Sequence, residues 1–224
     1  MHNKNAVIVG ASGLIGNLLR PLLIAQYSQM VSLVRRPSSD AETTANLIEA
    51  VVDFTKADFY TPHATAADCF CCVGTTIKIA GSKAAFRAVD YDVVINFAQA
   101  AKRAGCKRFY VVSALGANAK STVFYNRVKG EMEAALAALN FETCAIFRPS
   151  LLLGTRAQPR LGERIMELGF ALATPLLSIG NLRNIKPIKA SAVAQAMANA
   201  AKNPQPGLSI YEPLQILKLS SAFT

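Results

Sequence analysis

A tyrosine and a lysine lie one helical turn apart in the segment Tyr125-Asn126-Arg127-Val128-Lys129. At this spacing both side chains fall on one face of a helix. A free phenol, with a pKa near ~10, is a poor acid at neutral pH, but a nearby ammonium group lowers that pKa by favouring the ionised form. The pair could therefore serve in general acid–base catalysis. The same spacing is common by chance, so the interpretation depends on what surrounds the pair.

A serine precedes this pair at the end of a strand-like run, residues 108–112, and is followed by Ala114. The Ser113 hydroxyl could point at the tyrosine and lysine, or it could be a strand-end hydroxyl without a chemical role. The sequence leaves both alternatives open. If Ser113 points away, one hydrogen-bond donor to a substrate oxygen is missing, and carbonyl reduction should be slow.

A glycine-rich stretch near the N-terminus predicts a phosphate site; it reads Gly10-Ala11-Ser12-Gly13-Leu14-Ile15-Gly16. It follows the apolar run 6–9, typical of a strand, and precedes leucines at helical spacing. A strand that ends in a glycine turn opening a helix directs backbone N–H groups and a positive helix end at one point. We expect Gly10 to allow the turn, Gly13 to admit a pyrophosphate, and Gly16 to let helix and strand pack closely. A tight turn without a ligand is the simpler alternative, and Pro21 should kink the helix or end its regular bonding.

The alternation of strand-like and helical runs predicts an α/β fold, a Rossmann-like doubly wound parallel sheet. We expect one NAD(P)-binding domain over residues 1–224, in which residues of about 150 to 190 form a small C-terminal substrate lobe. Ser191 could cap a late helix. Further strands are expected at 30–34, 48–52, 68–73, 143–147 and 208–211, and helices at 82–104, which Gly105 ends, and at 121–138. Polar residues follow most of these strands, so they should gather at the carboxyl edge of the sheet, where such folds bind ligands.

Composition narrows the possible functions. Hydrophobic residues make up 52% of the 224 residues, which excludes general disorder. No apolar run reaches the length of a membrane-spanning helix and the first residues do not resemble a signal peptide, so we expect a cytoplasmic protein without membrane contact. The net charge of +10 suggests an anionic partner, although basic residues without interleaved aromatics make nucleic acid a poor candidate. The five cysteines lack zinc-binding spacing and the only histidines are His2 and His63, so we expect buried free thiols and no metal site.

Taken together, these motifs resemble the extended short-chain dehydrogenase/reductases, specifically the small atypical branch of Tat-interacting, oxidoreductase-like proteins and their bacterial relatives. The resemblance runs along essentially the whole chain and rests on the glycine turn and on five further segments, Arg35-Arg36, residues 51–54, 70–76, 107–109 and 147–149, together with Tyr125 and residues 128–131. It implies NADP(H) binding, with Tyr125 as the general acid and Lys129 as its partner. It also places Asp53 by the adenine, Gly74 and Thr75 along the cofactor and Pro149 near the nicotinamide. The full set of expected cofactor contacts is Gly10, Ser12, Gly13, Leu14, Ile15, Gly16, Arg35, Arg36, Asp53, Phe54, Gly74, Thr75, Lys129 and Pro149.

Two departures from the family pattern matter. The family often has two serines after the fifth strand, whereas this chain has Ser113-Ala114. Asp90 stands where many extended members carry an asparagine, and the sequence does not define its role.

The end of the second strand indicates which cofactor is preferred. A protein that prefers NAD commonly has an acidic residue there, which binds the adenosine ribose. Here the strand ends in Arg35-Arg36, with no acid before Asp40, and two guanidinium groups suit a 2′-phosphate. Solvated turn arginines are the alternative.

The sequence therefore predicts an NADP(H)-dependent oxidoreductase, with catalytic Tyr125, Lys129 and Ser113, that acts on a small carbonyl or alcohol substrate. The alternative is a catalytically weak NADPH-binding protein that regulates or binds a protein partner. An anionic substrate is possible, since Arg156, Arg160 and Arg164 would share one helix face, although a solvated face explains them equally well. The oligomeric state cannot be read from the sequence.

Overall fold

The computed structural model describes residues 2–37, 45–54, 56, 68–154 and 187–222. Its core is a seven-stranded sheet in which every neighbouring pair is parallel, in the order β3-β2-β1-β4-β5-β6-β9. This confirms the predicted Rossmann-like sheet. The chain adds strands in one direction from β1 to β3 and in the other from β4 onward, so a crevice opens between the carboxyl ends of β1 and β4. The strands are β1 (His2–Val9), β2 (Tyr27–Val34), β3 (Leu47–Val51), β4 (Asp68–Cys71), β5 (Arg108–Val112), β6 (Thr143–Phe147) and β9 (Gly207–Tyr211).

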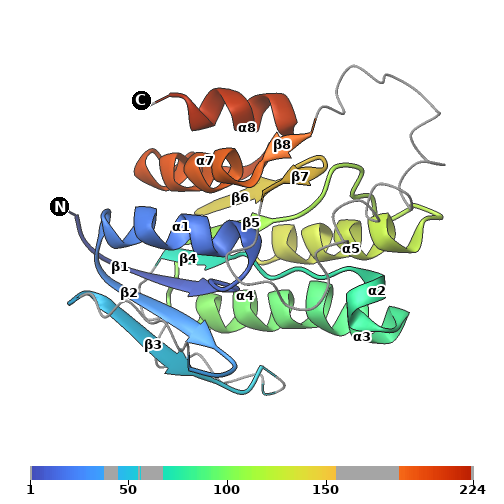
Figure 1. Cartoon of the computed structure of the whole chain (residues 1–224), viewed down its shortest axis with the longest axis horizontal. Coiled ribbons are helices and arrows are strands. Elements are labelled where there is room, and N and C mark those ends of the chain that lie inside the picture. The colour runs from blue at the N-terminus through green and yellow to red at the C-terminus, as the bar shows by residue number, and fades with distance from the viewer. Residues whose placement is uncertain (1, 38–44, 55, 57–67, 155–186, 223–224) are drawn as a thin grey trace.

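Helices cover both faces of this sheet (Figure 1). Alternate residues of a strand point to opposite faces, so Val7 and Val9 join one hydrophobic core while Ala6 and Ile8 join the other. The core around Val7 includes residues of α4 and α5, and the core around Ile8 includes residues of α1, α7 and α8. These helices are α1 (Leu14–Ile24), α4 (Val94–Arg103), α5 (Phe124–Ala138), α7 (Ala190–Lys202) and α8 (Pro213–Ser220).

The helix expected over residues 82–104 contains a change of winding. It begins as α3 (Lys83–Arg87), passes through a π-helical stretch, η2 (Ala88–Val93), and continues as α4. Gly105 follows with a φ of +82°, which confirms it as the C-terminal stop. A short helix, α2 (Ile77–Ala80), precedes this run and is capped by the Thr76 hydroxyl.

Other expectations need correction. Helix α1 continues three residues beyond Pro21, to Ile24, because the proline removes only one hydrogen bond from a helix whose buried face holds it in place. Ser191 does not cap α7, since that helix already begins at Ala190 and Lys189 occupies the N-cap position.

The C-terminal region contains elements that the sequence pattern did not predict. Helix α8 starts at Pro213, and Glu212 and Gln215 form a capping box there. Two short parallel strands, β7 (Leu152–Leu153) and β8 (Ile188–Lys189), pair with each other. Most of the expected substrate lobe, including the helical stripe at 161–172 and Arg156, Arg160 and Arg164, lies outside the described residues.

The cysteines occupy the sheet core and its borders. All five are free thiols, and four of them are buried. Burial raises the pKa of Cys71 and of Cys144 to about 12, which leaves both thiols protonated and unreactive at neutral pH. Within the described ranges, no group of His, Cys, Asp and Glu is arranged to hold a metal ion, and no helix is long and apolar enough to cross a membrane.

Gly130 sets how closely helix α5 approaches the loop before it. A Cβ atom at this position would lie 2.1 Å from the Ala119 nitrogen and 2.2 Å from the Asn118 carbonyl carbon. Neither backbone atom can move without displacing the loop that leads into α5. The helix that carries Tyr125 and Lys129 is therefore seated against backbone, with no space for a side chain.

We predict that Gly130→Ala lowers the free energy of unfolding by about 1–3 kcal/mol through overpacking, although alanine normally stabilises a helix. The exposed position Ala134 on the same helix provides the control, because Ala134→Gly should cost only about 1 kcal/mol of helix propensity. Denaturant unfolding of both variants makes the measurement. A Gly130→Ala protein more stable than the parent would contradict the close approach.

Candidate functional site

The glycine turn has the backbone geometry that a phosphate site requires. Gly10 has a φ of +83°, and a Cβ atom there would lie 2.6 Å from the Cys72 carbonyl carbon. At Gly16 a Cβ atom would lie 2.1 Å from the Gly10 carbonyl oxygen, so the first turn of α1 packs directly on the end of β1. These distances confirm the expected structural roles of Gly10 and Gly16.

The N-terminus of α1 is open for an anion. Gly13 is the N-cap residue, no side chain caps the helix, and its first turn contains no acidic residue. Leu14, Ile15 and Gly16 therefore present N–H groups and the positive end of the helix dipole to whatever lies beyond the turn. Ser12 is exposed beside them. These features fit the pyrophosphate of a dinucleotide cofactor.

A buried ion pair lies at the neighbouring strand end. The Lys129 Nζ atom is 2.6 Å from Asp90 Oδ1, and the two side chains are 4% and 0% exposed. Asp90 also accepts a hydrogen bond from the Thr75 N–H through Oδ2, at 2.9 Å. Burial alone would lower the pKa of Lys129, but the Asp90 carboxylate reverses this effect and holds it above its ordinary value. Lys129 is thus a permanent cation fixed between α5, η2 and the loop after β4.

Tyr125 lies on the same helix one turn earlier and packs on the buried Phe86 ring, with 5.3 Å between ring centroids. Its phenol experiences opposing influences. Burial raises its pKa, the Lys129 cation lowers it, and the Asp90 carboxylate raises it, so the balance stays above the ordinary value. The sequence led us to expect a lysine that lowers the pKa of the tyrosine. The structure adds a carboxylate that opposes this effect, and burial of the phenol outweighs it.

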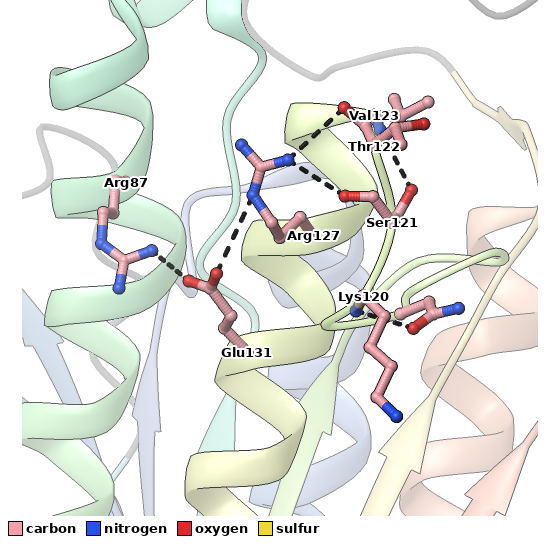
Figure 2. Close-up of polar contacts among 8 residues, drawn as sticks. Arg87, Lys120, Ser121, Thr122, Val123, Arg127 and Glu131 are labelled. Carbon is pink, nitrogen blue, oxygen red and sulfur yellow. Dashed lines mark hydrogen bonds and ion pairs between the residues drawn. The ribbon is translucent and has the colours of Figure 1, made fainter.

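Polar contacts fix the first turns of α5 (Figure 2). Arg127 donates to the carbonyl oxygens of Ser121 and Thr122 and also approaches the Glu131 carboxylate. Arg87 of α3 forms an ion pair with Glu131 from the other side. The bonded groups join α3, α5 and the loop before α5, so Tyr125 and Lys129 are held at a defined distance from η2.

Ser113 belongs to a different polar cluster. Its hydroxyl donates to Glu133 Oε1 at 2.5 Å, and Glu133 also receives the Arg148 guanidinium at 2.5–3.2 Å. Arg148 in turn lies 3.8 Å from Glu212, at the start of α8. Of the two alternatives for Ser113, the structure shows a strand-end hydroxyl occupied by another side chain. Ala114 follows it and has no hydroxyl to offer.

The remaining candidate residues lie after four strands that end at the same edge of the sheet. Arg35 and Arg36 directly follow β2, and both are exposed. Beyond the end of β3, Asp53 is exposed while Phe54 packs against the core. The other three follow β4 and β6, namely the exposed Gly74, the half-buried Thr75 and the buried Pro149. The structure thus gathers the whole predicted set at the carboxyl edge, apart from the side chain of Ser113.

A family model for NAD(P)H-binding proteins matches residues 10–150, which contain the glycine turn, Asp90, Tyr125 and Lys129. The chain belongs to this NAD(P)H-binding family. Rat protein HTATIP2 is 40% identical over 73% of the chain and 69% of its own length. The mitochondrial protein FMP52-1 of Scheffersomyces stipitis is 33% identical over 96% of the chain and 98% of its own length.

Solved structures of similar shape belong to the extended short-chain dehydrogenase/reductases. MoeE5 in complex with UDP-glucuronic acid and NAD has a TM-score of 0.69 at 16% identity, over 98% of this chain and 82% of its own. The Bordetella bronchiseptica enzyme WbmH, in complex with NAD+, has a TM-score of 0.70 at 15% identity, over 94% and 76%. These structures show the shared fold, and the sequence relatives confirm the predicted membership in the Tat-interacting, oxidoreductase-like branch of this NAD(P)-binding group.

The relatives correct one expectation. FMP52 proteins from several fungi, such as those of Eremothecium gossypii and Coccidioides immitis, are named as mitochondrial. This contradicts the expected cytoplasmic location, which rested on the lack of a membrane-spanning run and of a signal-peptide start. That criterion does not distinguish between compartments inside a cell.

Sequence reasoning missed the residues that hold the site together. The partners of Asp90 depend on how η2 winds, and the partner of Ser113 depends on how α5 lies against β5 and β6. Glu133 follows Lys129 by one helical turn, and that spacing was the available signal for placing it on the same face.

We predict that Ser113→Ala lowers the free energy of unfolding by about 1–3 kcal/mol, because it removes a buried hydrogen bond to a carboxylate. NADPH affinity should change little, since the Ser113 hydroxyl is directed at Glu133. Ser12→Ala is the matched control: at this exposed residue stability should change by less than about 0.5 kcal/mol while NADPH affinity falls. Chemical denaturation and calorimetric titration test both. If Ser113→Ala instead keeps the stability of the parent and loses most of its turnover, the Ser113 hydroxyl contacts the substrate rather than stabilising the fold.

Proposed function

We propose that this protein is an NADP(H)-dependent oxidoreductase that reduces a small carbonyl compound to an alcohol or catalyses the reverse reaction. The observation that carries the proposal is the buried Lys129, fixed by Asp90 one helical turn from Tyr125 at the strand edge where the glycine turn opens. A buried lysine requires a compensating partner, and ionisable groups held in this way cluster at functional sites. Family membership supports the cofactor class.

In this proposal each residue has a defined task. Bound NADP(H) supplies or accepts the hydride. Tyr125 gives its phenolic proton to the carbonyl oxygen during reduction and takes it back from the alcohol during oxidation. Lys129 is held in its charged form, so it can donate hydrogen bonds to ribose hydroxyls and steady the Tyr125 oxygen. The backbone N–H groups at the start of α1 bind the pyrophosphate.

Two exposed arginines support NADPH over NADH. Arg35 and Arg36 directly follow β2, whose carboxyl end lies beside the glycine turn at the end of β1. Guanidinium groups bind a phosphate with paired hydrogen bonds, and either one can stack on an adenine face. No acidic residue occurs between Val34 and Pro37 to repel a 2′-phosphate.

A specific observation favours the alternative function, a nucleotide-binding regulatory or interaction protein with little turnover. Ser113 is engaged by Glu133, and Ala114 cannot donate a hydrogen bond, so neither residue offers a hydroxyl to a substrate oxygen. Loss of one such donor typically costs roughly 10²–10³-fold in rate. A slow enzyme and a sensor therefore share this site, and turnover decides between them.

We predict that Tyr125→Phe lowers turnover by about two to four orders of magnitude, the range for a lost general acid, while NADPH affinity stays within a few fold. Lys129→Ala should lower both turnover and NADPH affinity. Tyr91→Phe is the control, because Tyr91 lies on η2 under the Arg87 guanidinium and has no task in the reaction.

NADPH oxidation with a panel of aldehydes and ketones provides the measurement. Equal turnover of Tyr125→Phe and parent would remove Tyr125 from the mechanism. A parent without turnover on the whole panel would favour the regulatory alternative.

We predict that the parent binds NADPH about 10- to 100-fold more tightly than NADH, from charge-assisted bonds of roughly 1.5–3 kcal/mol each. The double variant Arg35→Ala, Arg36→Ala should lose most of this preference. The control is the double variant Arg103→Ala, Lys107→Ala, which removes two positive charges at the opposite edge of the sheet. It should keep the preference for NADPH. Calorimetric titration with both cofactors decides the matter, and equal affinities in the parent would refute the preference.

A further inference from the structure

Asp90 is placed by an unusual piece of backbone. It lies in the π-helical stretch η2, between the regular helices α3 and α4, and its side chain is completely buried. Single π-helical turns within α-helices occur frequently at functional sites, because the wider winding redirects a side chain. The acid therefore does not occupy its position as part of a regular helix face.

The Asp90 carboxylate joins two elements of the candidate site. One oxygen forms the ion pair with Lys129 of α5, and the other accepts the Thr75 N–H of the loop after β4. A Cβ atom on Gly74 would lie 3.7 Å from Oδ1, so this loop passes directly over the carboxylate. A movement of the Thr75 loop is thereby coupled to the lysine through a single side chain.

The charges that act on Tyr125 come from a small group of residues. Lys129 acts from α5 and Asp90 from η2, and they influence the phenol in opposite directions. Cys71 of β4 lies within the electrostatic reach of both, but its thiol is uncharged at neutral pH because burial raises its pKa to about 12. Arg87 and Arg127 are engaged by Glu131 and by the rings of Tyr91 and Phe124. The carboxylate therefore opposes the lysine at the phenol, while burial of the phenol is the largest of the three influences on its pKa.

We propose that Asp90 is a positioning residue that fixes Lys129, opposes its charge at Tyr125, and so helps burial keep the tyrosine protonated as a donor for carbonyl reduction. This inference rests on the proposed function and specifies its direction. An asparagine at this position would fix the lysine without cancelling its charge. With Asp90, reduction should proceed at a constant rate through neutral pH, whereas oxidation, which needs the phenolate, should be confined to alkaline pH.

The test is a pH titration of Tyr125 in the cofactor-free protein, which does not depend on finding a substrate. Tyrosines are labelled with ¹³C at the ζ position, and the Tyr125 resonance is assigned by its absence in Tyr125→Phe. In the parent we expect its midpoint above ~10, the ordinary tyrosine value. In Asp90→Asn we expect a midpoint lower by about one pH unit or more, because the carboxylate that opposes the Lys129 cation is gone. Lys129 is labelled with ¹³C at the ε position in the same samples, since burial lowers its pKa once Asp90 is removed. A lysine that is neutral at the Tyr125 midpoint would also overturn the inference.

Asp92→Asn is the matched control, because Asp92 is an exposed carboxylate on the same π-helical stretch and should leave the midpoint unchanged. A Tyr125 midpoint that is unchanged or higher in Asp90→Asn would overturn the inference. If Asp90→Asn does not fold, a midpoint below about 9 in the parent would still overturn the inference.

The outcome separates this inference from the proposed function. A lowered midpoint without turnover on any carbonyl leaves the role of Asp90 intact and refutes the enzyme. Turnover with an unmoved midpoint supports the enzyme and refutes the role of Asp90. In an active parent, the pH at which alcohol oxidation reaches half of its maximum should fall in Asp90→Asn together with the NMR midpoint.

Discussion

The ion pair between Lys129 and Asp90 is the interaction on which the site depends. A lysine removed from water is costly unless a carboxylate accompanies it, and removal of either partner would leave the other charge buried. The pair therefore requires α5, η2 and the loop after β4 to keep their relative positions. Two features outside the site hold these elements in place. One is the close packing of Gly130 on the loop before α5, and the other is the contact of Glu131 with Arg87 and Arg127.

A second constraint is the close packing of backbone on backbone at the crevice. Gly10, Gly16 and Gly130 each occupy a position where a Cβ atom would collide with main-chain atoms. The first two bring α1 onto the end of β1, and the third brings α5 onto its own leading loop. As a result both helices reach the carboxyl edge of the sheet, one with free N–H groups at its first turn and the other with Tyr125.

Much of the fold follows from the sequence because local signals and tertiary structure agree. The strands at 108–112 and 143–147 are apolar after their first residue and have the expected bounds, and Gly105 ends its helix through a positive φ. The π-helical winding at Ala88–Val93 gives no such signal, since its residues suit a regular helix equally well. For the same reason the contacts of Asp90 and Ser113 could not be derived, because they depend on distances between elements rather than on spacing along the chain.

The central claim is that the crevice at the N-terminus of α1 binds the phosphates of an NAD(P)H cofactor. The most direct measurement is calorimetric titration of NADPH into the parent and into Gly13→Asp, which places a carboxylate at the open helix end. Gln205→Asp adds the same charge at the opposite end of the sheet, at an exposed residue just before β9. The account predicts that Gly13→Asp weakens binding by roughly 10-fold or more while Gln205→Asp binds like the parent. Equal affinity of Gly13→Asp and parent would contradict it.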